Sequence, residues 1–121
     1  MAGLTTAGLN ALLDSGLDAF ATASLHSSDP GATGLAEISG GSPAYARKAI
    51  TWAAATGAGR TTNVTPLFDV PASTVAYVGY WSGATFLGSR ALSATEVYAA
   101  QGTYLLSAIT ELLLLTTIGE P

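Results

Sequence analysis

The single histidine of the chain lies in a run of hydroxyl and carboxyl side chains. His26 is preceded by Ser24 and followed by Ser27, Ser28 and Asp29, which are the residue types of a Ser–His–Asp nucleophilic site. The members of such a triad converge from separate segments, whereas these residues are neighbours in one strand-to-turn stretch. Alternate side chains of a strand share a face but lie about 6–7 Å apart along it. We therefore expect a histidine at the edge of a loop, beside a capped turn, and no catalytic site.

Other catalytic and metal-binding patterns are weak. The eight acidic residues are scattered singly, without EF-hand spacing, and one histidine cannot form a His-x-x-x-His pair. The absence of cysteine excludes disulfides, thiol catalysis and cysteine zinc sites. The glycine-rich stretch from Gly34 to Gly41 lacks the Gly-Lys-Ser/Thr of a phosphate-binding loop. The sequence thus predicts no catalytic residue, metal or cofactor, although folding could still bring together the paired carboxylates of a glycoside hydrolase.

Aromatic and apolar side chains remain as candidate contacts. Tyrosine and tryptophan are enriched at interfaces because they are large and amphipathic, and Tyr80 and Trp81 are the pair least expected to be buried. Arg47 is expected to pair with an acid or a backbone carbonyl inside an assembly, because Arg47 and Lys48 face opposite ways on a strand and form no basic patch. The candidate interface or ligand contacts are Trp81, Tyr80, Arg47, Leu113 and Leu115.

The elements that must position these side chains are drawn from an unusually uncharged chain. Of the 121 residues 10% are charged and 49% are hydrophobic, with a net charge of −4, whereas soluble domains average about 25% charged residues. Four basic residues cannot form the surface that nucleic-acid binding needs. The run Leu112–Leu115 is far shorter than the roughly 20 residues of a spanning helix, so no membrane segment is expected, nor does the N-terminus resemble a secretion signal. The low charge therefore indicates either a bland Thr/Ser/Gly/Ala surface or one covered by partners.

Residues 4–15 predict a short helix, and residues 26–43 a long loop. Leucines recur at helical spacing, Thr5 or Thr6 can cap the start, and Gly16 can end the helix. The loop opens on the turn sequence Asp29-Pro30-Gly31 and is longer than most loops in compact domains. Such loops often bind something or are ordered by a neighbour.

The rest of the chain has the pattern of short strands separated by turns. About seven or eight such strands at turn spacings of roughly 8–12 residues are typical of a β-sandwich or barrel. Because no second helix is available for parallel crossovers, we expect one antiparallel β-sandwich domain over residues 1–121, jelly-roll-like, with a short N-terminal helix. The expected strands are 19–25, 45–53, 61–70, 74–81, 85–90, 96–100, 104–106 and 109–116.

Two of these strands are apolar on both faces. Segment 74–81 indicates either a central strand covered on each side or a strand with one face given to a partner. Segment 109–116, with four successive leucines, must also be covered on both faces. Charged residues are depleted in the cores of interfaces, so the pattern favours a closed homo-oligomer, a trimer or a hexamer.

One set of motifs is more specific than composition. Asp29-Pro30-Gly31, then Gly40-Gly41-Ser42-Pro43-Ala44-Tyr45-Ala46-Arg47, and later Val75-Ala76-Tyr77-Val78-Gly79-Tyr80-Trp81 stand in this order along the chain. From about Ala19 to Leu115 the sequence resembles a family of small tailed-bacteriophage structural proteins, commonly labelled tail fibre or minor tail proteins. The resemblance implies a protein of the virion rather than an enzyme, and it transfers no catalytic residue.

We therefore predict a non-enzymatic structural component of a tailed-bacteriophage virion, a minor tail or tail-fibre protein that oligomerises and attaches to other virion proteins. Two alternatives stay open. The chain could decorate the phage head as a minor capsid protein, or it could bind a host-surface glycan through the 26–43 loop and Trp81. Whether the N-terminal helix docks on its own subunit or on a neighbour is also left open.

Overall fold

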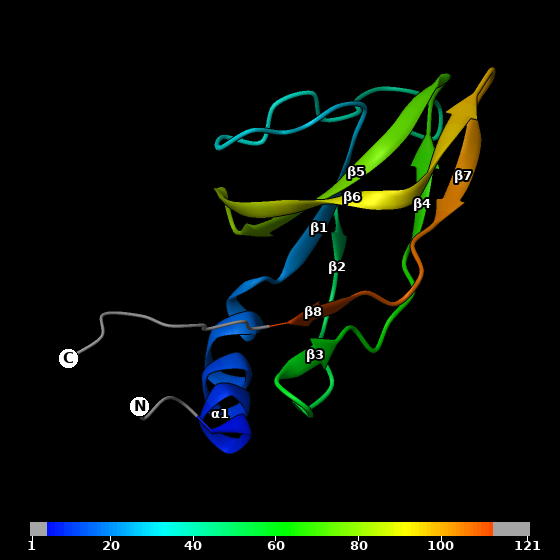
Figure 1. Ribbon diagram of the computed structural model, residues 1–121. Coiled ribbons are helices and arrows are strands. Elements are labelled where there is room, and N and C mark those ends of the chain that lie inside the picture. Colours follow the sequence, from blue (N-terminus) through cyan, green and yellow to red (C-terminus); the bar gives the residue numbers. More distant parts are fainter. Residues whose placement is uncertain (1–4, 113–121) are drawn as a thin grey trace.

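The structure is a computed structural model that describes residues 5–112, and within them antiparallel strand pairs dominate (Figure 1). Strands β2, β1, β5 and β6 form a four-stranded sheet in that order, β3 pairs with β8, and β4 pairs with β7. The predicted class, antiparallel β with a short N-terminal helix, is confirmed, and the open sheets are consistent with a sandwich. The elements are α1 (Thr6–Gly16), the 3-10 turn η1 (Leu17–Ala19), β1 (Thr22–His26), β2 (Lys48–Ala49), β3 (Gly59–Thr61), β4 (Leu67–Val70), β5 (Ser73–Ser82), β6 (Thr85–Tyr98), β7 (Gly102–Leu105) and β8 (Thr110–Leu112).

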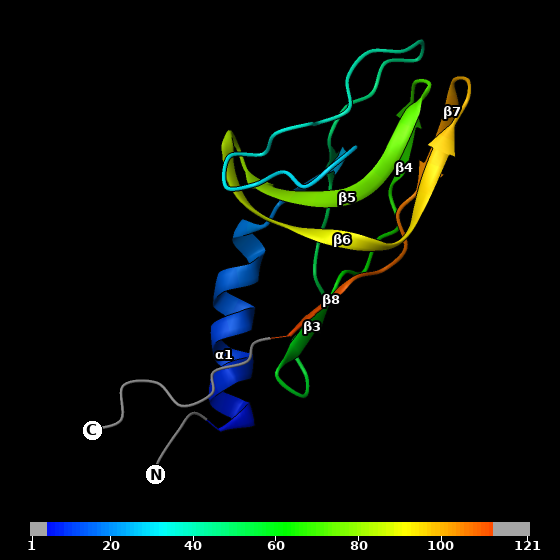
Figure 2. The same ribbon diagram turned by 45° about the horizontal axis from the view of Figure 1, so that its top comes forward.

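Other parts of the chain cover both faces of the four-stranded sheet. Segment 27–47 lies on one side of the β5–β6 ribbon, and α1, β3 and β8 lie on the other (Figure 2). Strand β5 is central, between β1 and β6, and it buries Val75, Val78, Tyr80 and Trp81. Of the two interpretations of segment 74–81, the central strand is confirmed, and these side chains need no partner to cover them.

Helix α1 forms where the sequence predicts it and docks on its own chain. The Thr5 hydroxyl accepts a hydrogen bond from the Gly8 N–H at 3.1 Å and caps the first turn. The helix buries only Leu13, so apolar burial on its own is a small anchor. Polar contacts add to it, because the side-chain oxygens of Asn10 and Asp14 accept from the backbone N–H groups of Ala58 and Ala55.

The expected break between segments 85–90 and 96–100 is wrong, since β6 runs continuously from Thr85 to Tyr98. The pairing with β5 jumps from Tyr77–Ala91 to Val75–Glu96, so residues 92–95, which include the polar Ser93 and Thr95, form a wide irregularity inside one strand. An edge strand tolerates such residues because one of its sides faces solvent.

Several other predicted strands are shorter than expected. Segment 45–53 contributes only Lys48–Ala49 to the sheet, and Trp52 beyond it makes an isolated bridge to Thr62. Segment 61–70 contributes only the last residue of β3 and all of β4, and Pro66, which lacks a backbone N–H, lies directly before β4. Segment 109–116 supplies β8 up to Leu112, and its later residues lie outside the described part of the chain.

Candidate functional site

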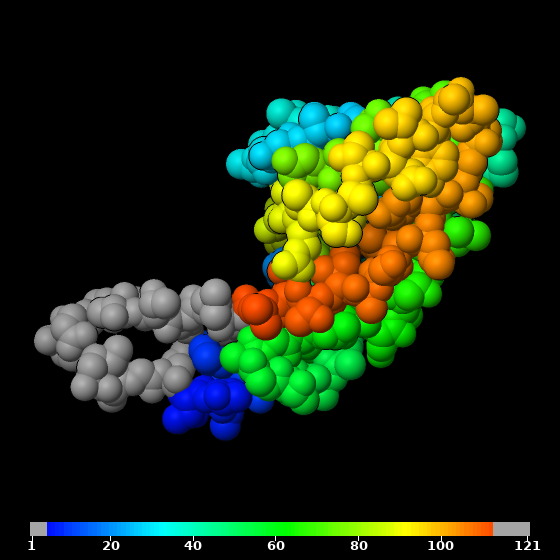
Figure 3. Space-filling model, turned by 45° about the vertical axis from the view of Figure 1, so that its right-hand side comes forward, coloured from blue at the N-terminus to red at the C-terminus, as the bar shows by residue number. Residues whose placement is uncertain are grey.

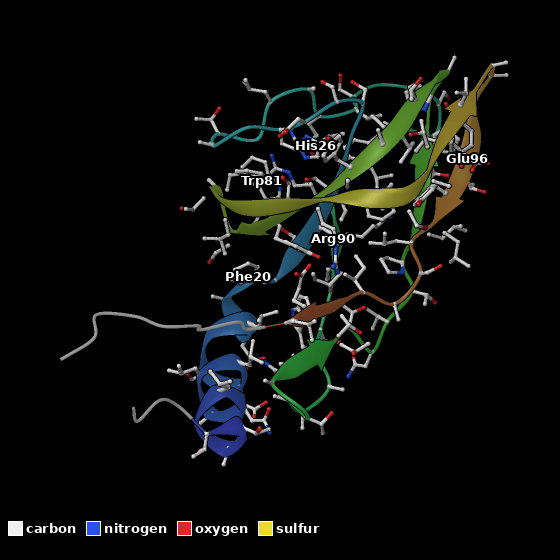
Figure 4. All side chains as sticks on the ribbon, viewed as in Figure 1. Phe20, His26, Trp81, Arg90 and Glu96 are labelled. Atoms are coloured by element: carbon white, nitrogen blue, oxygen red, sulfur yellow. The ribbon has the colours of Figure 1, made fainter. Side chains whose placement is uncertain are left out.

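A buried chain of hydrogen bonds connects β1, β5 and segment 27–47. The Ser24 hydroxyl lies 2.6 Å from His26 Nε2, and Trp81 Nε1 donates to the same hydroxyl oxygen at 2.7 Å. His26 Nδ1 lies 2.7 Å from the carbonyl oxygen of Leu35. Ser24 and His26 are both fully buried. Figure 4 shows His26 and Trp81 on the side of the sheet that segment 27–47 covers.

The partners determine which atoms carry the protons. A carbonyl oxygen only accepts, so His26 Nδ1 must carry the proton and donate to Leu35. His26 Nε2 is then the acceptor of a neutral imidazole and receives the Ser24 O–H. Burial lowers the pKa of His26, which the hydrogen bond to Leu35 and the nearby Glu37 carboxylate only partly oppose.

His26 does lie at the edge of the loop, as the last residue of β1, but it is fully buried, and the expected separation of Ser24 from His26 is wrong. The two side chains share a face and bend toward each other, which strand geometry permits because their polar atoms lie beyond Cβ. The pair still does not form a triad. The third group is a backbone carbonyl, Asp29 instead accepts from the Gly31 N–H in a turn, and both pair members are sealed from a substrate.

Glycines make room for this network. A Cβ on Gly79 would lie 2.5 Å from the Ser24 oxygen and 2.6 Å from His26 Nε2. Gly34 has a φ of +82°, and a Cβ there would lie 2.7 Å from the Trp81 ring. Sequence reasoning missed the network, although a glycine inside the apolar pattern of segment 74–81 is the signal that marks such a close approach.

A second polar cluster lies over the buried chain of hydrogen bonds around His26. Arg47 makes two hydrogen bonds to the Glu37 carboxylate, at 2.9 and 3.0 Å, and its guanidinium carbon lies 3.5 Å from the centroid of the Trp81 ring. The Tyr45 hydroxyl donates to Glu37 and accepts from the Leu25 N–H. Burial alone would raise the pKa of Glu37, but the hydrogen bonds from Arg47 and Tyr45 outweigh it and hold the pKa below its ordinary value. Arg47 therefore does pair with an acid, and that acid belongs to its own chain.

The aromatic pair at the end of β5 is buried, contrary to the sequence-based expectation. Trp81 is 7% exposed and Tyr80 is 3% exposed. Their side chains point to opposite faces of the sheet, where Trp81 packs against Phe86 and Tyr80 packs against Phe20 and Trp52. Segment 27–47 covers one face and the C-terminal strands the other, which is why neither ring is free. Leu113 and Leu115, the other apolar candidates, lie outside the described residues.

A groove borders β6 on the sheet face that carries Tyr80. Tyr80 donates to Glu111 at 2.6 Å, and Arg90 approaches the same carboxylate at 3.5 Å while donating to the Thr110 carbonyl. Burial raises the pKa of Tyr80 well above its ordinary range, and the hydrogen bond to Glu111 raises it further. Beside Arg90 opens a groove of about 530 Å³, lined in part by Leu92, Ser93, Tyr104, Leu106, Ser107 and Ile109.

The two edges of the four-stranded sheet differ. Strand β2 has two residues, one of them Lys48, whereas β6 has fourteen and contains neither proline nor lysine. No residue of β6 is buried, and its outer edge pairs with no other strand of the described chain. In the space-filling view β6, in yellow, is exposed along one face of the molecule (Figure 3).

Residues 5–112 contain neither a metal-binding cluster nor a membrane-spanning helix. No group of three or more His, Asp or Glu side chains in this range is placed to hold a metal ion. The one helix described here is too short to cross a bilayer.

Comparison with known proteins supports the resemblance seen in the sequence. Residues 5–111 match the family model described as podophage GP4 fiber I protein gp80. No curated protein and no solved structure gives a significant match. The matched region covers most of the 121 residues and nearly all of the fold described above. The chain therefore belongs to the family of the podophage GP4 fiber I protein gp80, and it is a structural component of a phage virion.

Proposed function

We propose that this chain is a non-enzymatic fibre subunit that associates with further copies of itself through the free edge of β6 and is attached by other surfaces to neighbouring virion proteins. Membership of a fibre family supports the structural role. The observation that carries the self-association is the contrast between the two edges of the β2–β1–β5–β6 sheet.

An open strand edge presents unpaired backbone N–H and C=O groups to any strand that approaches it. Proteins usually protect such edges with short strands, lysine, proline or bulges. Strand β2 has two of these protections, its shortness and Lys48. Strand β6 has only its irregularity near Ser93, and its sole charges are Arg90 and Glu96. A second copy of the chain can therefore pair with β6 at little electrostatic cost.

Exposed apolar side chains supply candidate surfaces for attachment to other virion proteins. Leu67 and Leu105 are cross-strand partners in the β4–β7 pair and are 54% and 57% exposed. Val97, near the end of β6, is 74% exposed. Because the buried aromatics are already covered by the chain itself, these side chains account better for a partner surface than Tyr80 or Trp81 does.

Sedimentation equilibrium tests the self-association directly. We expect the purified protein to have a mass that is a multiple of the 12.1 kDa chain. The double variant Ser89→Lys/Ala91→Lys places two charges on the β6 edge and is expected to shift the mass toward a single chain. The charge-matched control is Ala7→Lys/Ala11→Lys on exposed positions of α1, which is expected to keep the multimer. A single-chain mass for the wild-type protein contradicts self-association, whereas a multimer unaffected by the β6 lysines contradicts only the assigned edge.

We also propose a host glycan as a second, separable ligand, with the groove beside β6 as its site. Tyr104, Arg90, Ser93 and Ser107 give this groove an aromatic ring and several polar groups. A site on Trp81 would require Arg47 to leave the ring first. On a glycan array, binding that is lost in Tyr104→Ala and kept in Trp81→Ala supports the groove. The reverse result supports the 26–43 loop, and the absence of any binding contradicts this second function.

A further inference from the structure

We propose that His26 is a pH-sensitive latch that holds segment 27–47 against the sheet while its imidazole is neutral and releases this segment when the imidazole is protonated. The latch goes beyond the structural role proposed above and does not depend on self-association. It rests on the direction of each hydrogen bond around the ring.

The neutral ring satisfies every polar atom that it touches. Trp81 Nε1–H donates to the Ser24 oxygen, the Ser24 O–H donates to His26 Nε2, and His26 Nδ1–H donates to the Leu35 carbonyl. This single ordering uses each donor once and joins β5, β1 and the covering segment. Since all of these groups are buried or partly buried, no alternative ordering with water is at hand.

A second proton on the ring breaks this ordering. Nε2 would then carry a hydrogen aimed at the Ser24 oxygen, which can accept it beside the Trp81 N–H only if the Ser24 O–H turns away from the ring. The Ser24 proton would lose its acceptor, and Gly79 on the facing strand offers no side chain that could receive it. A buried charge would also be created without a direct counter-ion, which is costly in a low-dielectric environment.

The charged groups around His26 do not compensate for that charge. The backbones of Glu37 and His26 form an isolated β-bridge, so the Glu37 carboxylate acts on the ring, but its oxygens are already used by Arg47 and Tyr45. Arg47 itself repels a second cation. On the strands packed against the ring, β5 presents Tyr77 and Gly79 and β6 presents Phe86, none of them charged.

Segment 27–47 is the part of the molecule that can yield. Among its residues only Pro30 and Ile38 are buried, and Leu35, whose carbonyl His26 holds, is 64% exposed. The stretch 31–37 of this segment is attached more weakly than its ends, because the Ile38 N–H donates to the Leu25 carbonyl and Tyr45 stacks on Phe68. The Gln101 side chain holds Ser42 and Pro43, and the Glu37–Arg47 cluster lies over the Trp81 ring. Segments with few buried apolar contacts open at lower free energy than the core does. Opening uncovers the sheet face that carries Trp81 and Phe86.

The direction of the pH effect follows from linkage. Burial holds the pKa of folded His26 below its ordinary value of 6.5, so the open form binds the proton more tightly than the latched form. Opening is then favoured as the pH falls below 6.5. Glu37, whose pKa is held below 4.5, loosens the same segment only at more acidic pH.

An NMR titration of the full-length chain tests the latch, and the chain contains its own control. We expect the His26 ring signals to titrate below pH 6.5, and the Trp81 indole N–H and the backbone amides of 31–38 to follow the same curve. Corrected for intrinsic chemistry, amide exchange in this segment should rise by up to about tenfold per pH unit in that range. The Trp52 indole, which donates to the Phe20 carbonyl on the other face of the sheet, should stay unchanged.

Two variants separate His26 from the other titrating group. His26→Gln cannot titrate and is expected to abolish the step, whereas Glu37→Gln is expected to retain it. The proposal is overturned if His26 titrates at or above pH 6.5, if the Trp81 and Trp52 indoles respond together as in global unfolding, or if Glu37→Gln abolishes the step. Should His26→Gln fail to fold, the wild-type titration decides the matter by itself.

Discussion

Two buried basic side chains, His26 and Arg60, each pin a non-strand segment to the sheets, and they do so by different means. His26 is neutral and holds segment 27–47 through Leu35. Arg60, 7% exposed, is charged and holds the end of α1, where it donates to the carbonyl oxygens of Leu13 and Asp14. It also donates to the carbonyl oxygens of Ala53 and Trp52 in its own neighbourhood.

The difference between the two side chains is one of titration. An arginine stays protonated throughout the physiological range, whereas a histidine changes charge within it. The partners of Arg60 include Asp18 at 2.9 Å and Asp14 at 3.5 Å, so the helix end has counter-ions that the His26 ring lacks. Mild acid is therefore expected to loosen segment 27–47 while leaving α1 docked.

The largest effect on the free energy of unfolding is expected from replacing Arg60. Arg60→Met keeps most of the side-chain volume but removes the guanidinium donor from four backbone carbonyl oxygens, of which that of Leu13 keeps the Leu17 N–H. Hydrogen bonds from a buried cation are strong, so the free energy of unfolding should fall by about 3–5 kcal/mol. Urea denaturation measures this change, and Arg90→Met, at a half-exposed position, is the matched control. A loss below about 1 kcal/mol would show that water can replace Arg60 at the helix end.

A smaller effect on the free energy of unfolding is expected from adding a side chain next to Ser24 and His26. Gly79→Ala places a methyl group against Ser24 and His26, and overpacking of this kind costs about 1–3 kcal/mol. Gly88→Ala on the neighbouring strand is the matched control, because nothing lies within 4 Å of its added Cβ. Urea denaturation should separate the two variants, and the Trp81 indole N–H signal should shift in Gly79→Ala alone. Equal stability of the two variants would mean that the space under His26 is not restricted.

The sequence predicts the scaffold around these attachments better than the attachments themselves. Periodicity and capping residues place α1 within two residues at each end. The doubly apolar pattern limits β5 to a central strand or a strand with one face given to a partner, and the structure selects the first. These signals are local, since each depends on residues a few positions apart. The continuous β6 is missed because polar residues inside an edge strand look like a turn.

The attachments depend on residues that are far apart in the sequence. The partner of Trp81 is Ser24, 57 positions away, and Arg60 meets Leu13 across 47 positions. Neither pair leaves a periodic pattern. Only Gly79 and Gly34 give a local sign, because a glycine in an otherwise apolar strand or a left-handed turn marks where another side chain comes close. Burial of Trp81 likewise follows from a loop folding back, which strand alternation cannot indicate.

The smallest effect on the free energy of unfolding is expected from replacing Arg47, which lies over the His26 network where solvent screens its charge. Arg47→Ala removes the stacking on Trp81 and two hydrogen bonds to Glu37, but the Arg47 side chain is 34% exposed. Exposed ion pairs and cation–π contacts contribute little, so we expect the free energy of unfolding to fall by about 0.5–1 kcal/mol in urea denaturation, against no change for Lys48→Ala.

The more informative measurement on Arg47→Ala is the NMR titration of His26. Without Arg47 a cation that opposes His26 protonation is gone and the Glu37 carboxylate is freed, so the pKa of His26 should rise toward its ordinary value. The segment would then open at a higher pH in this variant than in the wild-type protein, although its neutral-pH stability is nearly the same. An unchanged His26 pKa would mean that the latch depends on burial alone, and that the Arg47–Glu37 cluster is a separate support of the same segment.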